Sequence, residues 1–416
     1  MPDRTDFDAV IVGGSIAGCA TAIHLGRAGR RVALVERRPD PDAFKRVCGH
    51  FIQASAVPAL RRLGVLDELE ALGAVRGRPR VWTRYGWIEP AGEDGRDRRS
   101  LSVRRQVLDP LLRRRAAATP GVELLLGHAL DALEPLDGGH RVRLTRRGEA
   151  RTLTTRLVVG ADGRGSHTAK LAGVRTRTST NARCAYWGYF EGPPLGTGAS
   201  VHIWLDGPEI GIVTPTDGEL TLYVAFPARE RAPEFKRDIE GSLRAFIGAL
   251  PDAPPIAESR LSGPLVGKVD LTNEWRRSTG RSLALVGDAA LAADPVGAIG
   301  CGWALQSAEW LAESLAGEPR PEAALRSYRR RHRRELLGHS LMAADAARGK
   351  PFSPVQRLIF SAAVTDPVTA ARVEDFAARL ERPGKLLSPR TLGRAALVNA
   401  RNRAPAPRRA ARTAAP

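Results

Sequence analysis

The stretch that most constrains how this chain can fold is residues 7–36, FDAVIVGGSIAGCATAIHLGRAGRRVALVE. Residues 9–12 are a short, mostly β-branched run of the kind that is buried in a parallel sheet. Gly13 and Gly14 then break the run into a tight turn, a helix follows, and a second apolar strand ends on Glu36. This order of strand, glycine turn, helix, strand and carboxylate predicts a βαβ unit that binds a dinucleotide.

Each part of this unit has a chemical reason. The helix expected over residues 16–28 begins with N–H groups that lack helical partners and with the positive end of its dipole, and both attract a pyrophosphate. Gly13 and Gly18 stand where the backbone approaches the phosphates and where helix packs on strand, and Ser15 takes the place of the middle glycine of G-x-G-x-x-G. Glu36, 18 residues after Gly18, is placed to bind both hydroxyls of a ribose and repels a 2′-phosphate, so FAD or NAD is expected rather than NADP. The alternative is a βαβ unit whose glycines serve packing only.

Length and composition indicate a globular protein of two or three domains, with 416 residues, 43% of them hydrophobic and 26% charged. No apolar run reaches the roughly 18 residues of a membrane span, and the acidic N-terminus MPDRTDFD has no signal-peptide core, so we expect a cytoplasmic protein. The cysteines lie far apart, without CxxC or histidine partners at ligand spacing, which argues against a disulfide framework and against a metal site. These cysteines are Cys19, Cys48, Cys184 and Cys301.

The net charge of +19 raises the question of nucleic-acid binding. Arginine supplies nearly all of this excess, and part of it lies in residues 401–416, a proline-, alanine- and arginine-rich tail that we expect to be disordered. No helix-turn-helix, RNP or zinc-finger pattern accompanies the charge. We therefore expect a solvated basic surface that attracts an anionic cofactor or substrate, and no nucleic-acid partner.

Further along the chain, the sequence predicts both strands and helices. Short alternating pieces in residues 77–95 are typical of an inserted hairpin or strand pair. From about residue 176 to 264 the strands become rich in aromatic residues, and one helical piece is expected over residues 235–250. A long helix is expected over residues 302–315, and the remainder has helical spacing with arginine-rich exposed faces.

Four separated motifs suggest a family. They are GGSIAG with Glu36, RRQVLD at residues 104–109, VVGADGRGS at residues 158–166, and LALVGDAALAADPVGAIGCGWALQSAEWLAESL at residues 283–315. In this order they resemble the group A FAD-dependent monooxygenases, which have the para-hydroxybenzoate hydroxylase-like fold. The resemblance covers roughly residues 5 to 345.

The resemblance implies an α/β fold, a Rossmann-like FAD-binding domain (GR2/PHBH-like) with an inserted mixed β-sheet substrate domain and C-terminal helices. The expected division is 5–78, 101–175 and 269–345 for the three parts of the FAD-binding domain, 79–100 for a β insertion, 176–268 for the substrate-binding sheet, 346–400 for a helical region and 401–416 for the disordered tail.

By the same resemblance Arg105 holds the FAD pyrophosphate region, Asp162 and Gly163 support the nucleotide end, and Asp288 binds the ribityl chain. The residues themselves support the role of Asp288, because a carboxylate that follows the carboxyl end of a strand can accept hydrogen bonds from ribityl hydroxyls. The alternative is that Asp288 is an ordinary helix cap. Backbone N–H groups near residues 300–302, at a helix start, can stabilise the negative charge of a reduced flavin. The full set of expected FAD-binding residues is Gly13, Ser15, Ile16, Ala17, Gly18, Glu36, Arg37, Lys45, Arg105, Asp162, Gly163, Gly287, Asp288, Pro295, Gly300, Cys301 and Gly302.

The chain departs from the family pattern at several positions. Ala298 stands where P-x-x-G-x-G has its first glycine, Leu291 replaces a histidine after GDAA, and Lys170 replaces an arginine after the Asp-Gly turn. The segment K-x-x-C-G, from Lys45 to Cys48 and the next residue, resembles the geranylgeranyl reductase and flavin halogenase branch, but the halogenase W-x-W-x-I-P segment is absent. Cys48 is thus either a redox or packing residue beside the flavin or a small buried hydrophobe.

The activity that the resemblance implies is hydroxylation or epoxidation by NAD(P)H and O₂ through a C4a-hydroperoxyflavin. No second G-x-G-x-x-G is present, so NAD(P)H is expected as a transient reductant of tightly but non-covalently bound FAD. The alternatives are an FAD-dependent reductase or oxidase acting on an isoprenoid or polyketide, and a non-enzymatic nucleotide-binding protein.

The substrate is expected to be a small apolar or aromatic molecule of secondary metabolism. The protein is expected to be a monomer or a homodimer. Aromatic residues of the second sheet are candidates for the pocket, with plain core as the alternative. These residues are Tyr186, Trp187, Tyr189, Trp204 and Tyr223. No catalytic set is evident, and the candidates for redox or proton transfer are Cys48, His50 and His202.

Overall fold

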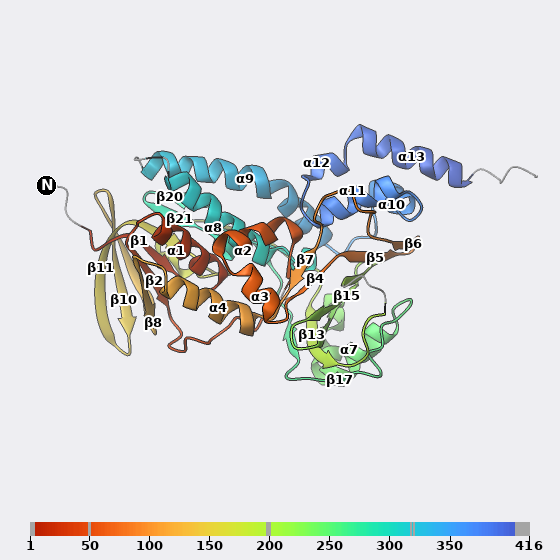
Figure 1. Cartoon of the computed structure of the whole chain (residues 1–416), viewed down its shortest axis with the longest axis horizontal. Coiled ribbons are helices and arrows are strands. Elements are labelled where there is room, and N and C mark those ends of the chain that lie inside the picture. Colours follow the sequence, from red (N-terminus) through yellow and green to blue (C-terminus); the bar gives the residue numbers. More distant parts are fainter. Residues whose placement is uncertain (1–4, 49–50, 197–200, 317, 319–320, 404–416) are drawn as a thin grey trace, which may run out of the picture.

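The computed structural model describes residues 5–48, 51–196, 201–316, 318 and 321–403. Figure 1 shows the N-terminal sheet and its helices at one end of the molecule and a second sheet at the other end, with the C-terminal helices beside it. This α/β architecture, with a nucleotide-binding part, a second mixed sheet and C-terminal helices, confirms the predicted fold class.

The first sheet is built around β1 (Phe7–Val12), which is parallel to β2 (Val32–Glu36) on one side and to β11 (Glu149–Gly160) on the other. Parallel pairing continues to β8 (Val122–Leu126) beyond β2 and to β21 (Leu283–Leu285) beyond β11. All of β2 and the last four residues of β1 are buried, as a sheet covered on both faces requires. The antiparallel strands of this sheet are β9 (Ala129–Leu136), β10 (Gly139–Arg146) and β20 (Thr279–Gly280).

Helix α1 (Ile16–Arg27) packs on α4 (Arg105–Ala117) and on α8 (Gly300–Ala316), and α8 packs on α9 (Pro321–Ala346). The N-terminal ends of α1 and α8 thereby come to the same region, above the carboxyl ends of the parallel strands. In open parallel sheets this edge is where nucleotides bind.

The second sheet has the order β17-β13-β16-β15-β14-β5-β6, with β18 beside β13. Its strands are β5 (Pro79–Thr83), β6 (Gly86–Ile88), β13 (Ala185–Glu191), β14 (Val201–Leu205), β15 (Ile210–Thr216), β16 (Leu220–Phe226), β17 (Arg260–Leu261) and β18 (Val266–Lys268). The β5–β6 hairpin pairs parallel with β14, so the short strands within residues 77–95 extend this sheet.

One helical piece over residues 235–250 was expected, and this prediction is wrong. Two helices are present, α6 (Ala232–Arg237) and α7 (Ile239–Gly248). Asp238 between them has an extended backbone, and its carboxylate accepts a hydrogen bond from the backbone N–H of Gly241. A new N-cap therefore ends one helix and starts the next.

Two three-stranded sheets connect the larger parts. One contains β12 (Thr176–Ser179), β19 (Asn273–Arg276) and β22 (Leu291–Ala292), and the other β3 (Phe51–Ile52), β7 (Ser100–Ser102) and β4 (Val75–Gly77). The short helices are α2 (Val57–Leu63), α3 (Leu66–Ala71) and α5 (His167–Leu171), with single 3₁₀ turns η1 (Ala54–Ala56), η2 (Arg229–Arg231), η3 (Gly287–Ala289) and η4 (Pro295–Gly297).

The C-terminal helices are α10 (Pro354–Ala363), α11 (Pro367–Ala377), α12 (Pro383–Leu386) and α13 (Pro389–Arg403). Ile359 and Ala363 of α10 share an apolar cluster with Val81 and Ile88, so this bundle covers the hairpin end of the second sheet. Of the tail expected to be disordered, residues 401–403 belong to α13 and residues 404–416 lie outside the described part.

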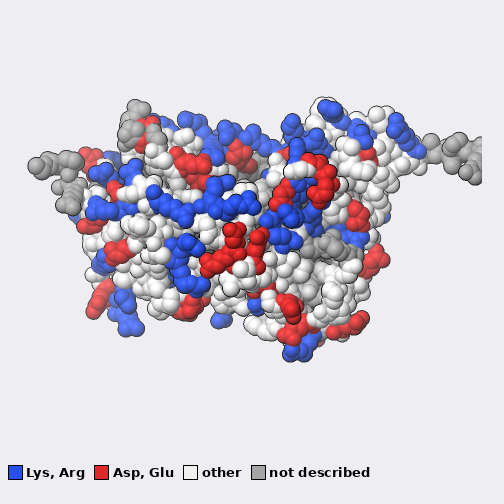
Figure 2. Space-filling model, viewed as in Figure 1, with Lys and Arg blue, Asp and Glu red and all other residues white. Residues whose placement is uncertain are grey.

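Figure 2 shows that basic and acidic side chains lie side by side over the visible face. Arg76, for example, pairs with both Glu70 and Asp97. Among the described residues, no helix combines the length and the apolar character needed to span a bilayer.

Candidate functional site

The glycine turn after β1 is too tightly packed for side chains. Gly13 has φ +112°, and a Cβ there would lie 2.4 Å from the carbonyl oxygen of Ala161, at the end of β11. A Cβ on Gly18 would lie 1.7 Å from the carbonyl oxygen of Gly13. Both glycines are thus required for α1 to meet β1 and β11.

Glu36 ends β2 as a buried, hydrogen-bonded carboxylate. Oε2 accepts from the N–H of Gly14 at 2.9 Å, and Oε1 accepts from N and Nε of Arg38, each at 3.0 Å. Burial by itself raises the pKa of Glu36, but the bonds from Arg38 and Gly14 outweigh it and hold the pKa below its usual value. An ionised acceptor therefore stands beside the glycine turn, where a ribose would be bound.

The N-terminus of α1 has the donor set that a pyrophosphate requires. Ser15 is the N-cap, yet its side chain makes no capping bond; its Oγ instead accepts from Nη2 of Arg105 at 2.6 Å. Arg105 is buried and is held by Asp109 through bonds of 2.8 and 3.0 Å. The N–H groups of the first helical turn and a fixed guanidinium thus lie together, which fits an FAD pyrophosphate.

Two cysteines meet beside Arg105. Nη1 of Arg105 lies 3.2 Å from Sγ of Cys48, and Sγ of Cys48 lies 3.6 Å from Sγ of Cys301 in the first turn of α8. The contact with Cys48 and burial raise the pKa of the Cys301 thiol. No sequence pattern connects the two cysteines, because they are 253 positions apart and such a separation carries no spacing signal.

Lys45 and Asp288 form the next contact along the site. Nζ of Lys45 lies 3.0 Å from Oδ2 of Asp288, and the backbone N–H of Lys45 donates to Asp109 at 3.0 Å. Burial raises the pKa of Asp288, but the charges of Lys45 and Arg164 outweigh it, so the pKa lies below its usual value. A Cβ on Gly300 would lie 3.5 Å from Oδ1 of Asp288, which places the α8 start against this carboxylate.

Asp162 forms hydrogen bonds within the loop that follows β11. Its carboxylate accepts from Ser166 Oγ and from the N–H and Oγ1 of Thr168, at 2.8 and 3.0 Å for the two Thr168 bonds. Gly163 has φ +79°, and no atom of the described residues lies within 4 Å of the position that a Cβ would take. The motif therefore shapes the turn after β11.

Other expected residues fall at the margins or outside the described chain. Ile16 and Ala17 are buried in α1, Arg37 is exposed after β2, and Pro295 begins η4. Gly287 has φ +56° and approaches Ala17, and Gly302 approaches Ala56, so both serve close packing. His50 lies outside the described residues.

Arg113 also holds the glycine turn in place, although no sequence motif singled it out. It is 1% exposed and donates to the carbonyl oxygens of Gly14, Pro41 and Ala43. Its position eight residues after Arg105, on the same face of α4, was the available signal.

The second sheet separates the expected aromatic residues onto two faces. Tyr186, Trp204 and Tyr223 are buried with Phe235 on the face covered by α6 and α7. Trp187 lies on the other face, in a cluster with strand residues and Val296 of η4, and Tyr189 packs against that cluster. Nε1 of Trp187 is buried and has no hydrogen-bond partner within the described ranges. The structure thus directs Trp187 and Tyr189 toward the turn that follows the Asp288 segment.

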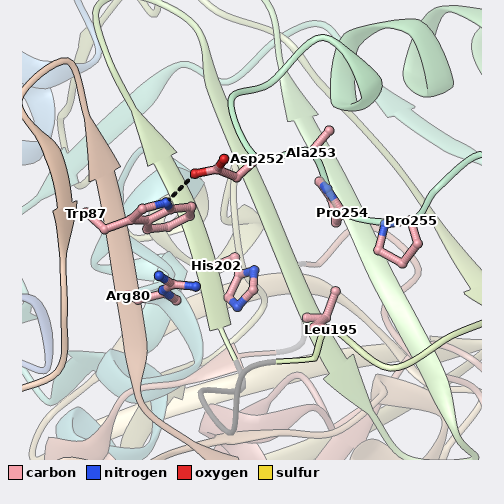
Figure 3. A pocket seen from close by; sticks show the side chains of 8 residues that line it. All are labelled: Arg80, Trp87, Leu195, His202, Asp252, Ala253, Pro254 and Pro255. Atoms are coloured by element: carbon pink, nitrogen blue, oxygen red, sulfur yellow. Dashed lines mark hydrogen bonds between the residues drawn. The ribbon is translucent and has the colours of Figure 1, made fainter.

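His202 lies in a separate cavity on the face that carries Trp204 (Figure 3). The cavity has a volume of about 280 Å³, and Arg80 lies over the ring of Trp87 at 4.1 Å, while Trp87 Nε1 donates to Asp252. Burial lowers the pKa of His202 to about 4. The structure does not bring His202 together with Cys48, Lys45 or Asp288.

Comparison with known proteins identifies the family. The FAD binding domain family matches residues 6–340. Kynurenine 3-monooxygenase of Salinispora arenicola is 31% identical over 348 residues, 77% of this chain and 74% of that protein. Kynurenine 3-monooxygenase of Myxococcus xanthus is 29% identical, covering 71% of this chain and 68% of that protein.

Solved structures share the fold. p-Nitrophenol 4-monooxygenase PnpA from Pseudomonas putida DLL-E4 has a TM-score of 0.74 at 21% identity, covering 90% of this chain and 98% of that one. Flavin-dependent brominase Bmp2 has a TM-score of 0.74 at 16% identity, covering 95% and 99%. The matched family and the glycine-turn geometry agree, and the chain belongs to the FAD binding domain family as a flavin-dependent monooxygenase.

Proposed function

We propose that FAD lies extended along the row of contacts that runs from Glu36 to the start of α8, and that an aromatic substrate is hydroxylated beside it. The observation that carries this proposal is the contact chain Ser15–Arg105–Cys48–Cys301, which joins four distant segments. Such a row matches a long cofactor better than a compact ligand.

Each group in the row has a part in holding the cofactor. Glu36 accepts from the adenosine ribose, and the α1 N-terminus with Arg105 holds the pyrophosphate. Asp288 accepts from ribityl hydroxyls, and its ion pair with Lys45 keeps it ionised and oriented. Backbone N–H groups of Gly300, Cys301 and Gly302 at the start of α8 would stabilise the negative charge of a reduced flavin.

The substrate lies against the face of the second sheet that carries Trp187. That face is apolar, and η4 brings Val296 into contact with it, so the chain can exclude water from the reacting ring. The activity named for the curated relatives, kynurenine 3-monooxygenation, supports an aromatic substrate. We also propose a cytoplasmic enzyme, monomeric or homodimeric.

Bound FAD would supply hydride acceptance from NAD(P)H and the activation of O₂. In the balanced reaction, NAD(P)H, a proton, O₂ and the aromatic C–H compound give NAD(P)⁺, water and the hydroxylated product. The chain supplies position and a dry site.

The test uses the purified holoenzyme with NADH or NADPH, ¹⁸O₂ and a panel of aromatic compounds. We expect reductant consumption that rises with substrate, and a product that carries one ¹⁸O atom. A product formed without oxygen would contradict the proposal and favour the reductase alternative.

A further inference from the structure

Arg379, in the loop between α11 and α12, is a half-buried residue whose guanidinium has no acid partner among the described residues. Its Nε and Nη1 atoms are inaccessible to solvent and have no hydrogen-bond partner within the residues that the structure describes. Burial lowers the pKa of Arg379 to about 9. A buried guanidinium without an anion is unfavourable, so its retention requires an explanation.

The acids near Arg379 are all taken by other arginines. Glu374 binds Arg78, and Asp375 binds Arg98. Glu381, two residues after Arg379, binds Arg372 through both oxygens. None of these three carboxylates is therefore paired with Arg379.

The backbone holds Arg379 in a fixed and unusual place. Its φ is +60°, in the left-handed region that non-glycine residues rarely adopt. The loop is anchored on both sides, since Leu380 N donates to Asp375 O at 2.9 Å and Ser55 N donates to Ala378 O at 3.2 Å. The position is therefore built into the loop.

The side chain of Arg379 reaches the junction of the cofactor row and the second sheet. Its guanidinium carbon lies 5.0 Å from the ring centroid of Trp303, in the first turns of α8. A Cβ on Gly297 of η4 would lie 3.6 Å from Nη2. Val296, the preceding residue, packs against the cluster that holds Trp187, whose own Nε1 is a second buried donor without an acceptor among the described residues.

We propose that Arg379 binds a carboxylate of the aromatic substrate, with the ring lying toward Trp187. This inference rests on the proposed function and adds the substrate class: an aromatic acid. A carboxylate accepts two parallel N–H groups from one edge of a guanidinium, so on Arg379 it would pair the unpartnered Nε together with Nη2, or the unpartnered Nη1 together with Nη2. Arg379 is then a residue that determines specificity, contributed by the C-terminal helices to a site otherwise made by the two sheets.

The experiment measures binding to the holoenzyme by the change in flavin absorbance. The probes are benzoate and 2-aminobenzoate, each compared with its primary amide. We expect the acids to bind at least about tenfold more tightly than the amides, as a charge-assisted pair lost with the amide implies. Arg379→Gln should abolish this preference, and Arg379→Lys should keep part of it.

Arg382→Gln is the matched control. Arg382 lies three residues away and is paired with Glu335, so its loss removes one charge from the same loop and should leave the acid preference unchanged. The melting temperature of Arg379→Gln without ligand should equal or exceed that of the parent, because a buried unpaired cation is removed. A structural arginine would instead lower it.

Several results would overturn the proposal: equal affinity for acids and amides, an acid preference that survives in Arg379→Gln, or inorganic phosphate or bromide competing as well as benzoate. If Arg379→Gln does not retain FAD, Arg379→Lys provides the test. An Arg379→Lys protein that binds the acids no more tightly than their amides would also contradict the proposal. If the acids bind but no compound is oxygenated, the proposed monooxygenase function is wrong and the Arg379 carboxylate site stands. If only neutral aromatic compounds are oxygenated, the Arg379 site is wrong and the monooxygenase function stands.

Discussion

Lys45 and Asp288 are 243 residues apart in the sequence, and their side chains form an ion pair of 3.0 Å between Nζ and Oδ2. The first precedes Cys48 in the segment after β2, and the second follows the last parallel strand, β21. Because Asp109 also accepts from the backbone of Lys45, the pair ties the start of α4 to the start of α8. The position that we propose binds the ribityl chain is therefore fixed by three segments at once.

The Asp288 carboxylate should make a measurable contribution to FAD affinity. Replacing it by alanine removes a charged acceptor worth about 1.5–3 kcal/mol, so we expect the dissociation constant for FAD to rise on the order of tenfold to a hundredfold. Asp288→Asn should lose less, since its amide oxygen still accepts. Fluorescence quenching of FAD on titration with apoprotein measures both, with Asp206→Asn, which alters a pair with Arg84 on the second sheet, as the control. Unchanged affinity in Asp288→Ala would remove Asp288 from the site.

Gly18 should tolerate no side chain. In Gly18→Ala the added methyl would meet the carbonyl oxygen of Gly13 at 1.7 Å, so the turn between β1 and α1 has to shift and the protein should be purified without flavin. Gly393→Ala is the control, because no described residue has an atom within 4 Å of its Cβ position in α13 and alanine favours helix by about 1 kcal/mol. Flavin absorbance and the melting temperature report both outcomes, and a yellow Gly18→Ala protein of parental stability would refute the packing argument.

Trp187 and Trp204 should respond differently to replacement by phenylalanine. Trp204 Nε1 donates to the carbonyl oxygen of Pro251 at 2.7 Å, so Trp204→Phe leaves that acceptor unpaired and should cost about 1–3 kcal/mol of unfolding free energy. Trp187 Nε1 has no acceptor within the described ranges, so Trp187→Phe should cost less than about 1 kcal/mol while it weakens substrate binding. Urea unfolding and the KM for the substrate separate the two effects. Equal destabilisation of the two variants would contradict the assignment of the faces.

His332 should make the protein acid-sensitive. Burial lowers its pKa from 6.5 to about 4, and its Nε2 has no partner in the described chain. Between these values the unfolded chain takes up a proton that the folded protein does not, so stability is present above pH 6.5 and is lost as the pH falls toward 4, by at most about 3 kcal/mol. His332→Phe should flatten this loss in urea unfolding at pH 7.5 and pH 5, while the exposed His167→Gln should behave as the parent does. If His332→Phe loses as much stability as the parent over this range, His332 is not responsible.

Much of the nucleotide-binding part could be predicted from local pattern. The helix expected over residues 16–28 is α1 (Ile16–Arg27), and the second strand ends on Glu36 as expected. These elements have strong periodicity, clear glycine punctuation and short connections. The break at Asp238 was missed, because the periodicity of residues 235–250 runs through a capping residue that only its extended backbone reveals.

By itself, the sequence determined the βαβ unit, the carboxylate at Glu36 and the order of the motifs, since these depend on neighbours within about 30 residues. The tertiary structure decided which side chains meet: Cys48 with Cys301, Lys45 with Asp288, and Trp187 on the face opposite Trp204. It also decided that Nε and Nη1 of Arg379 would have no hydrogen-bond partner among the described residues, while many other arginines pair with acids. The physical reason is that contacts across 100 residues or more follow from how sheets and helices pack, and no local spacing encodes which of several equivalent arginines, cysteines or tryptophans will be brought to the site.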